Sequence, residues 1–257
     1  MNHEDLVAKS LFYFLLIMAL FQNHKKSNAK SAILFAENTP LTIKINENTV
    51  SGLAGDLFIE AIKLAKISNN FNISWTPWRR ALFESTTKRN IFIVPIGDTE
   101  ENKKKYNFIF KILSDNIYII TLKPTIEIKN PHDIKKLKSI GYIAGAPYEP
   151  IFKKYNFEKM IEPSNDGDYV VAKLLAKRVD GFLAAYENGI YKLRKAHVEK
   201  SRIQKGIPLG KINWYFGTNI KSTTEDINSL KNALNSLAKT PKYIEIYKKY
   251  GLTPPQN

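Results

Sequence analysis

Residues 91–99 read IFIVPIGDT, an apolar run from Ile91 to Ile96 followed directly by Gly97, Asp98 and Thr99. A continuous apolar run of this length is typical of a strand that is buried on both faces of a parallel sheet. The loop after such a strand lies at the carboxyl edge of the sheet, where α/β proteins commonly bind ligands. The stretch therefore predicts an α/β fold with binding residues at the ends of its strands.

Strand and helix patterns alternate on both sides of this run. Further strands are expected at residues 41–45, 71–75, 108–112, 117–122, 139–143, 159–162, 179–184 and 211–218. Helices are expected at residues 56–65, 77–87, 131–136, 149–155, 166–177, 186–195, 224–238 and 241–250. The alternation pauses at Lys123-Pro124 and then resumes, which predicts two α/β lobes with a ligand cleft between them and a pair of closing helices.

The composition excludes several classes of site. The chain has 44% apolar and 25% charged residues, as a globular protein does, and it has no cysteine. Disulfides, thiol nucleophiles and cysteine-based metal centres are therefore excluded. The four histidines are scattered without metal-ligand spacing, so we expect neither a metal nor a cofactor. The net charge of +15 comes from dispersed lysines and no nucleic-acid-binding module is present, so we expect no nucleic-acid partner.

The N-terminal region has the pattern of an export signal. Residues 11–21 read LFYFLLIMALF, which has the length of a signal-peptide core and about half the length of a membrane-spanning helix. Small residues follow, and they predict cleavage near Ala32 or Ala36 and a mature chain that begins around Glu37. Residues 1–36 are thus expected to be a signal peptide that directs the protein to the periplasm. An uncleaved anchor and a start at a different methionine are the alternatives.

Five motifs follow one another in the rest of the chain. They are Gly55–Ala61 (GDLFIEA), Pro77–Leu82 (PWRRAL), Gly97–Glu101 with Tyr106–Phe108, Arg178–Phe182 (RVDGF) and Ile244–Gly251 (IEIYKKYG). Together they resemble bacterial extracellular solute-binding family 3, the amino-acid-binding class of type II periplasmic solute-binding proteins. The resemblance covers roughly residues 41–252. It implies lobe 1 at residues 37–122 and 216–257, lobe 2 at residues 123–215, and two crossover strands that act as a hinge near residues 122 and 216.

The resemblance also implies a function. A family member is a monomer that binds a small molecule and delivers it to the membrane permease of an ABC importer, without catalysis. Two alternatives stay open. The chain is alternatively a ligand-sensing subunit of a membrane sensor protein, or a lyase or dehydratase on the same scaffold, with Glu187, Asp98 or Asp166 as the acid or base.

Two anchors of the family are replaced in this sequence. The family holds the ligand α-carboxylate with an arginine three residues after the threonine, where Asn102 stands. It holds the α-ammonium with an aspartate five residues after the R-V-D aspartate, where Ala185 stands. We therefore predict a small polar ligand other than a standard α-amino acid. The net positive charge slightly favours an anionic or neutral one.

Other residues are candidates for the missing charges and for the cleft wall. Arg79, Arg80 or Lys103 would replace the cation, and Glu187 or Asp166 the anion, with Arg80 favoured over Arg79 by the family pattern. Asp180 is expected to be a structural cap, and Trp214 and Tyr215 are expected in the core. The predicted ligand-binding residues are Trp78, Arg80, Gly97, Asp98, Thr99, Gly145, Tyr148, Tyr186 and Glu187.

Overall fold

The computed structural model describes residues 30–36 and 38–255, and from Ser31 onward the chain forms one compact unit. The apolar core of the expected export signal, residues 11–21, lies outside the described residues. Among the described residues, no helix is both long and apolar enough to cross a membrane.

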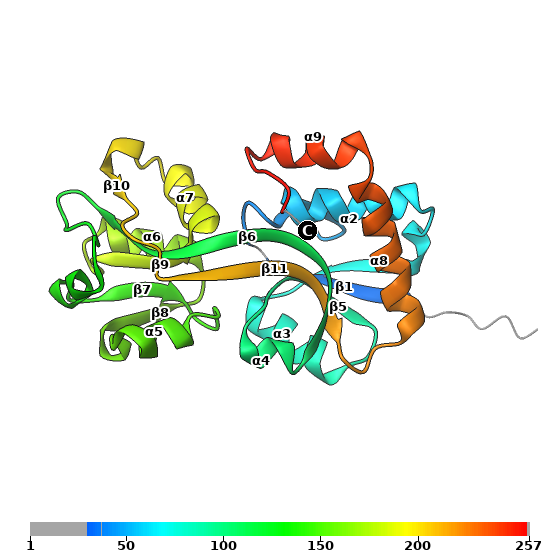
Figure 1. The fold of residues 1–257 in the computed structure, drawn as a ribbon, viewed down its shortest axis with the longest axis horizontal. Coiled ribbons are helices and arrows are strands. Elements are labelled where there is room, and N and C mark those ends of the chain that lie inside the picture. Colours follow the sequence, from blue (N-terminus) through cyan, green and yellow to red (C-terminus); the bar gives the residue numbers. More distant parts are fainter. Residues whose placement is uncertain (1–29, 37, 256–257) are drawn as a thin grey trace, which may run out of the picture. The chain divides into compact units, whose positions relative to one another are not determined.

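Strands and helices alternate along the chain (Figure 1). The strands are β1 (Ser31–Phe35), β2 (Ile43–Asn46), β3 (Thr49–Ser51), β4 (Phe71–Trp75), β5 (Ile91–Gly97), β6 (Tyr106–Leu122), β7 (Ile140–Ile143), β8 (Ile161–Ser164), β9 (Gly181–Ala185), β10 (Ile203–Gln204) and β11 (Gly210–Asn219). The α-helices are α2 (Gly52–Leu64), α3 (Trp78–Thr87), α4 (Glu100–Lys103), α5 (Glu149–Tyr155), α6 (Gly167–Leu175), α7 (Tyr186–Lys195), α8 (Thr224–Ala238) and α9 (Pro241–Lys249). Short 3-10 helices are η1 (Ser68–Asn70), η2 (Pro131–Lys136), η3 (Glu158–Met160) and η4 (Lys200–Arg202).

The sheet runs through two lobes, which confirms the predicted two-lobed α/β fold. Its strand order is β4-β1-β5-β11-β6-β9-β7-β8, with β10 paired to β6. Parallel strands β4, β1 and β5 form one lobe, and parallel strands β9, β7 and β8 form the other. The antiparallel pair β6 and β11 crosses between them (Figure 1). Strand β11 pairs with β5 of the first lobe, strand β6 pairs with β9 of the second lobe, and the two strands pair with each other between them. Because this pairing is continuous, the lobe boundaries that the sequence suggests at residues 122 and 215 stay predictions.

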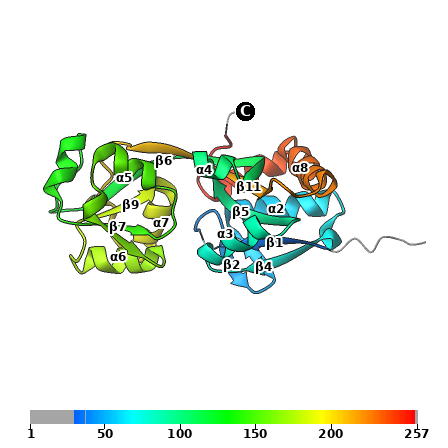
Figure 2. The same ribbon diagram turned by 90° about the horizontal axis from the view of Figure 1, so that it is seen from below.

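Helices cover both faces of each half of the sheet (Figure 2). In the first lobe, Phe35 of β1 packs in the cluster that includes α2, α8 and α9, and its neighbour Leu34 packs with Ala81 of α3. In the second lobe, Ile119 of β6 belongs to the cluster that contains α5, and Ile120 packs with α6 and α7. Successive residues of a strand point to opposite faces, so strands covered on both faces need continuous apolar runs.

Strand β1 corrects the expected end of the export signal. Ser31–Phe35 pairs in parallel with β4 on one side and β5 on the other, and the side chains of Ile33 and Phe35 are fully buried. Cleavage near Ala36 would remove this strand from between β4 and β5, and cleavage near Ala32 would remove its first two residues. The predicted boundary at residue 36 is therefore incompatible with the fold, and any signal that is removed must end before β1.

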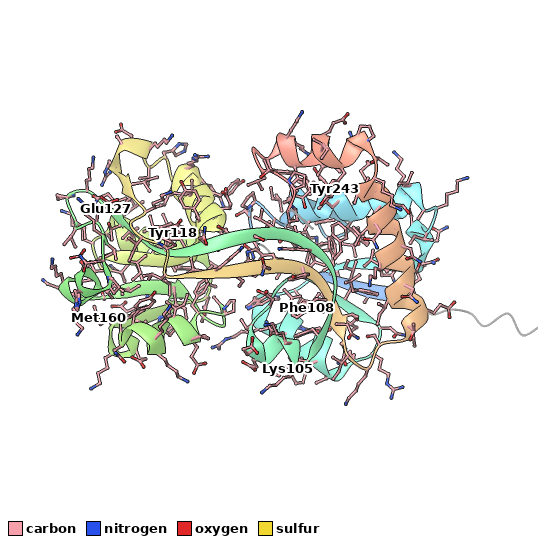
Figure 3. All side chains as sticks on the ribbon, in the orientation of Figure 1. Lys105, Phe108, Tyr118, Glu127, Met160 and Tyr243 are labelled. Carbon is pink, nitrogen blue, oxygen red and sulfur yellow. The ribbon has the colours of Figure 1, made fainter. Side chains whose placement is uncertain are left out.

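The C-terminal helix α9 closes the first lobe. Tyr243, labelled in Figure 3, packs edge-on against Tyr247, with ring centroids 4.9 Å apart. The buried Tyr247 hydroxyl donates a hydrogen bond of 2.6 Å to the carbonyl oxygen of Ile112 on β6. Helix α9 is thus bonded to a crossover strand.

Candidate functional site

A cavity of about 520 Å³ opens between the two lobes, and we call it the interlobe cavity. Trp75, Thr76 and Trp78 line it from the first lobe, at the end of β4 and the start of α3. The second lobe contributes Tyr148 before α5, Asp166 before α6, and Asn188 and Lys192 of α7. Trp214 on β11 lines it from the crossover. Its volume lies within the usual range of small-molecule sites.

All three tryptophans of the chain line the interlobe cavity. Trp75 packs against Phe35, with ring centroids 5.7 Å apart and the planes inclined by 38°. Trp214 is 5% exposed, so it belongs to the core, as expected, while it also forms part of the cavity wall. Indoles provide large rigid apolar surfaces with a hydrogen-bond donor at the edge, so this wall suits a ligand with an apolar or cationic body.

Trp78 also connects the lobes. Its indole Nε1 donates a hydrogen bond of 3.1 Å to the carbonyl oxygen of Gly145, which follows β7 in the second lobe. Gly145 has φ of +81°, a backbone conformation that favours glycine. Trp78 and Gly145 also line a second cavity of about 670 Å³, together with Thr99 and Asn102.

A second connection between the lobes is made by Asn188 of α7. Its Nδ2 donates hydrogen bonds of 2.8 Å to the side-chain Oδ1 of Asn38 and 2.8 Å to the carbonyl oxygen of Thr39. Asn188 is 9% exposed, so both bonds are largely shielded from water. These two bonds and the Trp78–Gly145 bond hold the lobes together across the cavity.

The loop after β5 bonds to itself and to β11. The Asp98 carboxylate accepts hydrogen bonds from the backbone N–H of Asn213 (2.8 Å) and from its Nδ2 (2.7 Å). Thr99 Oγ1 accepts from the Asn102 N–H at 3.1 Å, and Asn102 Nδ2 donates to the Gly97 carbonyl oxygen at 2.8 Å. Asn102 thus uses its side chain within the loop. Gly97 and Asp98 line neither cavity.

Arg80 lies away from both cavities. Its side chain is 72% exposed and its Nε lies 2.7 Å from Glu84 Oε1, one helical turn further along α3. Hydrogen bonds from Arg80 and Lys88 lower the pKa of Glu84. Adjacent helical residues point about 100° apart, and it is Arg79 whose Cγ approaches Gly145, 3.8 Å from where a Cβ on that glycine would stand.

Tyr148 contacts Ala185. Ala185 stands at the position where the family resemblance places an aspartate. The Tyr148 hydroxyl accepts a hydrogen bond of 2.9 Å from the Ala185 N–H, and both residues are buried. Burial raises the pKa of Tyr148 well above its usual value. The site therefore offers a neutral hydroxyl, already bonded, in place of a carboxylate for a ligand α-ammonium.

Tyr186 and Glu187 lie beside the crossover strand and line neither cavity. Tyr186 packs edge-on against Tyr118 of β6, with ring centroids 5.6 Å apart. The Glu187 N–H donates a hydrogen bond of 3.1 Å to the buried carboxylate of Asp115, which is also on β6. Burial raises the pKa of Asp115, and burial together with the Asp115 charge raises the pKa of Glu187.

The sequence reasoning missed Lys192 and Asp168. Lys192 is 5% exposed, and its Nζ lies 3.1 Å from Asp168 Oδ1. Lys195 Nζ lies 3.0 Å from the other oxygen. Partial burial raises the pKa of Asp168, but hydrogen bonds from Lys195 and Lys192 outweigh it and the pKa is lowered. Asn188 and Lys192 stand four residues apart on an expected helix, and this shared face was the available signal.

Two buried polar atoms of cavity-lining residues have no hydrogen-bond partner among the described residues. They are the Nε1 of Trp75 and the Oγ1 of Thr76, which are consecutive at the end of β4. Buried polar groups in proteins are nearly always paired, and an unpaired one costs about 1–3 kcal/mol. Their position points to the cavity wall near β4 as a place where a polar ligand atom would be stabilised.

The two lobes, the paired crossover strands and the interlobe cavity define the periplasmic-binding-protein fold. A histidine kinase sensor domain with similarity to periplasmic binding proteins matches with a TM-score of 0.75 at 12% identity, over 90% of this chain and 100% of that chain. A histidine-bound substrate-binding protein of an ABC uptake transporter from Streptococcus pneumoniae matches with a TM-score of 0.74 at 20% identity, over 90% and 96%. The arginine-, lysine-, histidine-binding protein ArtJ from Geobacillus stearothermophilus matches with a TM-score of 0.72 at 19% identity, over 88% of this chain and 97% of that chain. No protein-family model and no curated protein matches the sequence.

Proposed function

We propose that this protein is an extracytoplasmic solute-binding protein that captures a small polar molecule between its lobes for an ABC-type importer. The observation that carries the proposal is the tryptophan-lined interlobe cavity, whose walls come from both lobes and from crossover strand β11. Lobes that meet across a ligand and are joined by two strands can close by a hinge motion. The hydrogen bonds of Trp78 and Asn188 across the cavity would stabilise the closed arrangement.

The proposed ligand is not a standard α-amino acid held in the family's usual way. Asn102 carries no charge, and its amide is bonded to Gly97. Ala185 offers no carboxylate, and its N–H is bonded to Tyr148. A carboxylate clamp and an ammonium acceptor are therefore both missing at the positions that the resemblance indicates.

We propose that the chain binds its solute without converting it. Asp98 is bonded to Asn213 and lines neither cavity, and Asp166 caps the start of α6 through the Tyr169 N–H, so that only Asp166 of these two lies at the solute site. Glu187 lines neither cavity. A general acid or base must reach the reacting group, and these placements favour passive binding. Formation of a product from a bound solute would refute this part of the proposal.

A sensory role is the second candidate, because one of the similar structures is a histidine kinase sensor domain. In that case the solute-loaded protein would stimulate a separate membrane sensor. The two roles are distinguished by reconstituting the loaded protein with each membrane partner. Stimulated ATP hydrolysis by a permease supports transport, and stimulated autophosphorylation of a kinase supports sensing.

The test of solute binding is a thermal-shift screen with amino acids, small carboxylates, polyamines, organic cations and sugars. A ligand at one hundred times its Kd stabilises the folded state by about 2.7 kcal/mol, which moves the melting temperature by several degrees. We expect a stabilising solute outside the standard α-amino acids. Tight binding of an ordinary α-amino acid would contradict our interpretation of Asn102 and Ala185, and a screen without any stabilising solute would contradict the proposed function.

A further inference from the structure

The charged residues that line the interlobe cavity differ in whether they form ion pairs. Lys44 is ion-paired with Glu47, and Lys192 is ion-paired with Asp168 at 3.1 Å. Asp166 also lines the cavity, and it has no ion-pair partner among the described residues. Its Oδ1 accepts a hydrogen bond from the Tyr169 N–H at 2.9 Å. Each lining lysine thus has a carboxylate partner, although Lys192 shares Asp168 with Lys195, while the lining carboxylate of Asp166 takes part in none of these ion pairs.

The aromatic wall favours the same sign of ligand charge. The faces of indole rings are electronegative and attract cations, with tryptophan the most effective side chain. Three indoles line this cavity from three different elements. A cavity that combines indoles with an available carboxylate is suited to a cation. The net charge of +15 describes the whole chain, whereas the charges that face the cavity decide the ligand.

The cavity offers little to an anion. The start of α6, which faces the cavity, already carries the Asp166 cap and the Asp168 carboxylate, so its partial positive charge is compensated. Arg80 points to solvent and is paired with Glu84. A carboxylate group on the ligand would therefore have to compete with Asp168 for Lys192 or with Glu47 for Lys44.

We infer that the interlobe cavity binds a small organic cation that carries no carboxylate group, with Asp166 as its counter-charge and Trp75, Trp78 and Trp214 as its aromatic wall. This inference rests on the proposed solute-binding function and specifies its ligand class. It separates this chain from the arginine-, lysine-, histidine-binding protein and the histidine-bound substrate-binding protein to which its fold is similar.

Two matched probe pairs test the inference by titration, with tryptophan emission as the readout. Choline is compared with its neutral analogue, in which a quaternary carbon replaces the nitrogen, and agmatine is compared with arginine, which differs by one carboxylate. We expect the better of the two cations to bind at least about tenfold more tightly than its partner. Equal affinity within both pairs, or binding of neither cation, would overturn the inference.

Substitutions of Asp166 and Trp75, each with a matched control, test whether these two residues contribute to cation binding. Asp166→Asn keeps an oxygen that can cap α6 but removes the charge, and we expect it to weaken cation binding about fivefold. Asp180→Asn is its control, because Asp180 also accepts a backbone N–H bond in the second lobe but lines neither cavity. Trp75→Leu should weaken binding more than Trp75→Phe, which keeps an aromatic face. Unchanged affinity in Asp166→Asn and Trp75→Leu would remove both residues from the site.

The broader solute screen distinguishes failure of the cation inference from failure of the proposed solute-binding function. If another class of solute shifts both the melting temperature and the tryptophan emission while the cations do neither, the cation inference fails and the solute-binding function stands. If no solute in the screen produces either change, both fail.

Discussion

We expect the balance between open and closed lobes to be most sensitive to substitution of Asn188. Its Nδ2 makes two hydrogen bonds of 2.8 Å to the other lobe, and the residue is 9% exposed. Each such bond contributes about 1 kcal/mol net, so Asn188→Ala should destabilise the closed arrangement by about 2 kcal/mol. This shifts the ratio of closed to open molecules about 30-fold toward the open state. A ligand that binds only the closed state would lose the same factor in affinity once the open state predominates.

The absence of cysteine in the chain makes this shift directly measurable. Asn232→Cys on α8 and Lys159→Cys in η3 replace exposed residues, one in each lobe, and they would be the only sites for a pair of fluorescent labels. Energy transfer between the labels should fall in Asn188→Ala. The control is Asn72→Ala, an exposed asparagine on β4. If Asn188→Ala and Asn72→Ala give the same energy transfer and the same ligand affinity as the parent, the contacts of Asn188 do not set the closure.

Three further predictions concern the fold and the groups around the cavity. Tyr148→Phe removes the hydroxyl bonded to the Ala185 N–H, so the free energy of unfolding in urea should fall by about 1–3 kcal/mol, and an unchanged value would refute the buried bond. Burial raises the pKa of Asp115, so the folded state holds a proton that the unfolded chain releases; stability should fall as the pH rises from the ordinary carboxyl range to the raised pKa, and Asp115→Asn should flatten this slope. A chain that starts at Glu37 lacks β1 and should fail to fold, whereas one that starts at Lys30 should melt cooperatively; cooperative melting of the shorter chain would contradict the role of β1.

The fold was predictable because the buried strands have a clear pattern. The run Ile91–Ile96 is buried on both faces in β5, as its continuous apolar character predicts. The long strand β6 was expected as two strands, because Ser114, Asp115 and Asn116 interrupt its apolar pattern. These residues lie where β6 crosses between the lobes, and pairing with β11 continues the strand there.

The first strand was missed for a different reason. Residues 32–36 read AILFA, and such a run fits both a buried strand and the small-residue region behind a signal-peptide core. Only the pairing partners β4 and β5, which lie far along the chain, distinguish the two interpretations. The local sequence does not indicate which distant strands a segment will pair with.

The candidate site was predictable where it follows strand ends. The structure places Trp78 and Tyr148 on the interlobe cavity, and Thr99 and Gly145 on the second cavity. Arg80, by contrast, belongs to the exposed face of α3 because helical geometry separates it from its neighbours. Asn188 and Lys192 share a helical face that the sequence indicates, but their position in the cavity wall opposite Trp75 depends on how distant elements approach each other, which no local pattern encodes.

The central claim is that a small solute binds between the lobes, and the chain's own tryptophans test it. Because all three line the interlobe cavity, a solute bound there should change the tryptophan emission. The decisive measurement is a titration of a stabilising solute, followed by thermal shift and by emission on the same protein. The account predicts that both signals change with the same Kd. A solute that raises the melting temperature but leaves the emission unchanged would place binding outside the cavity and contradict the account.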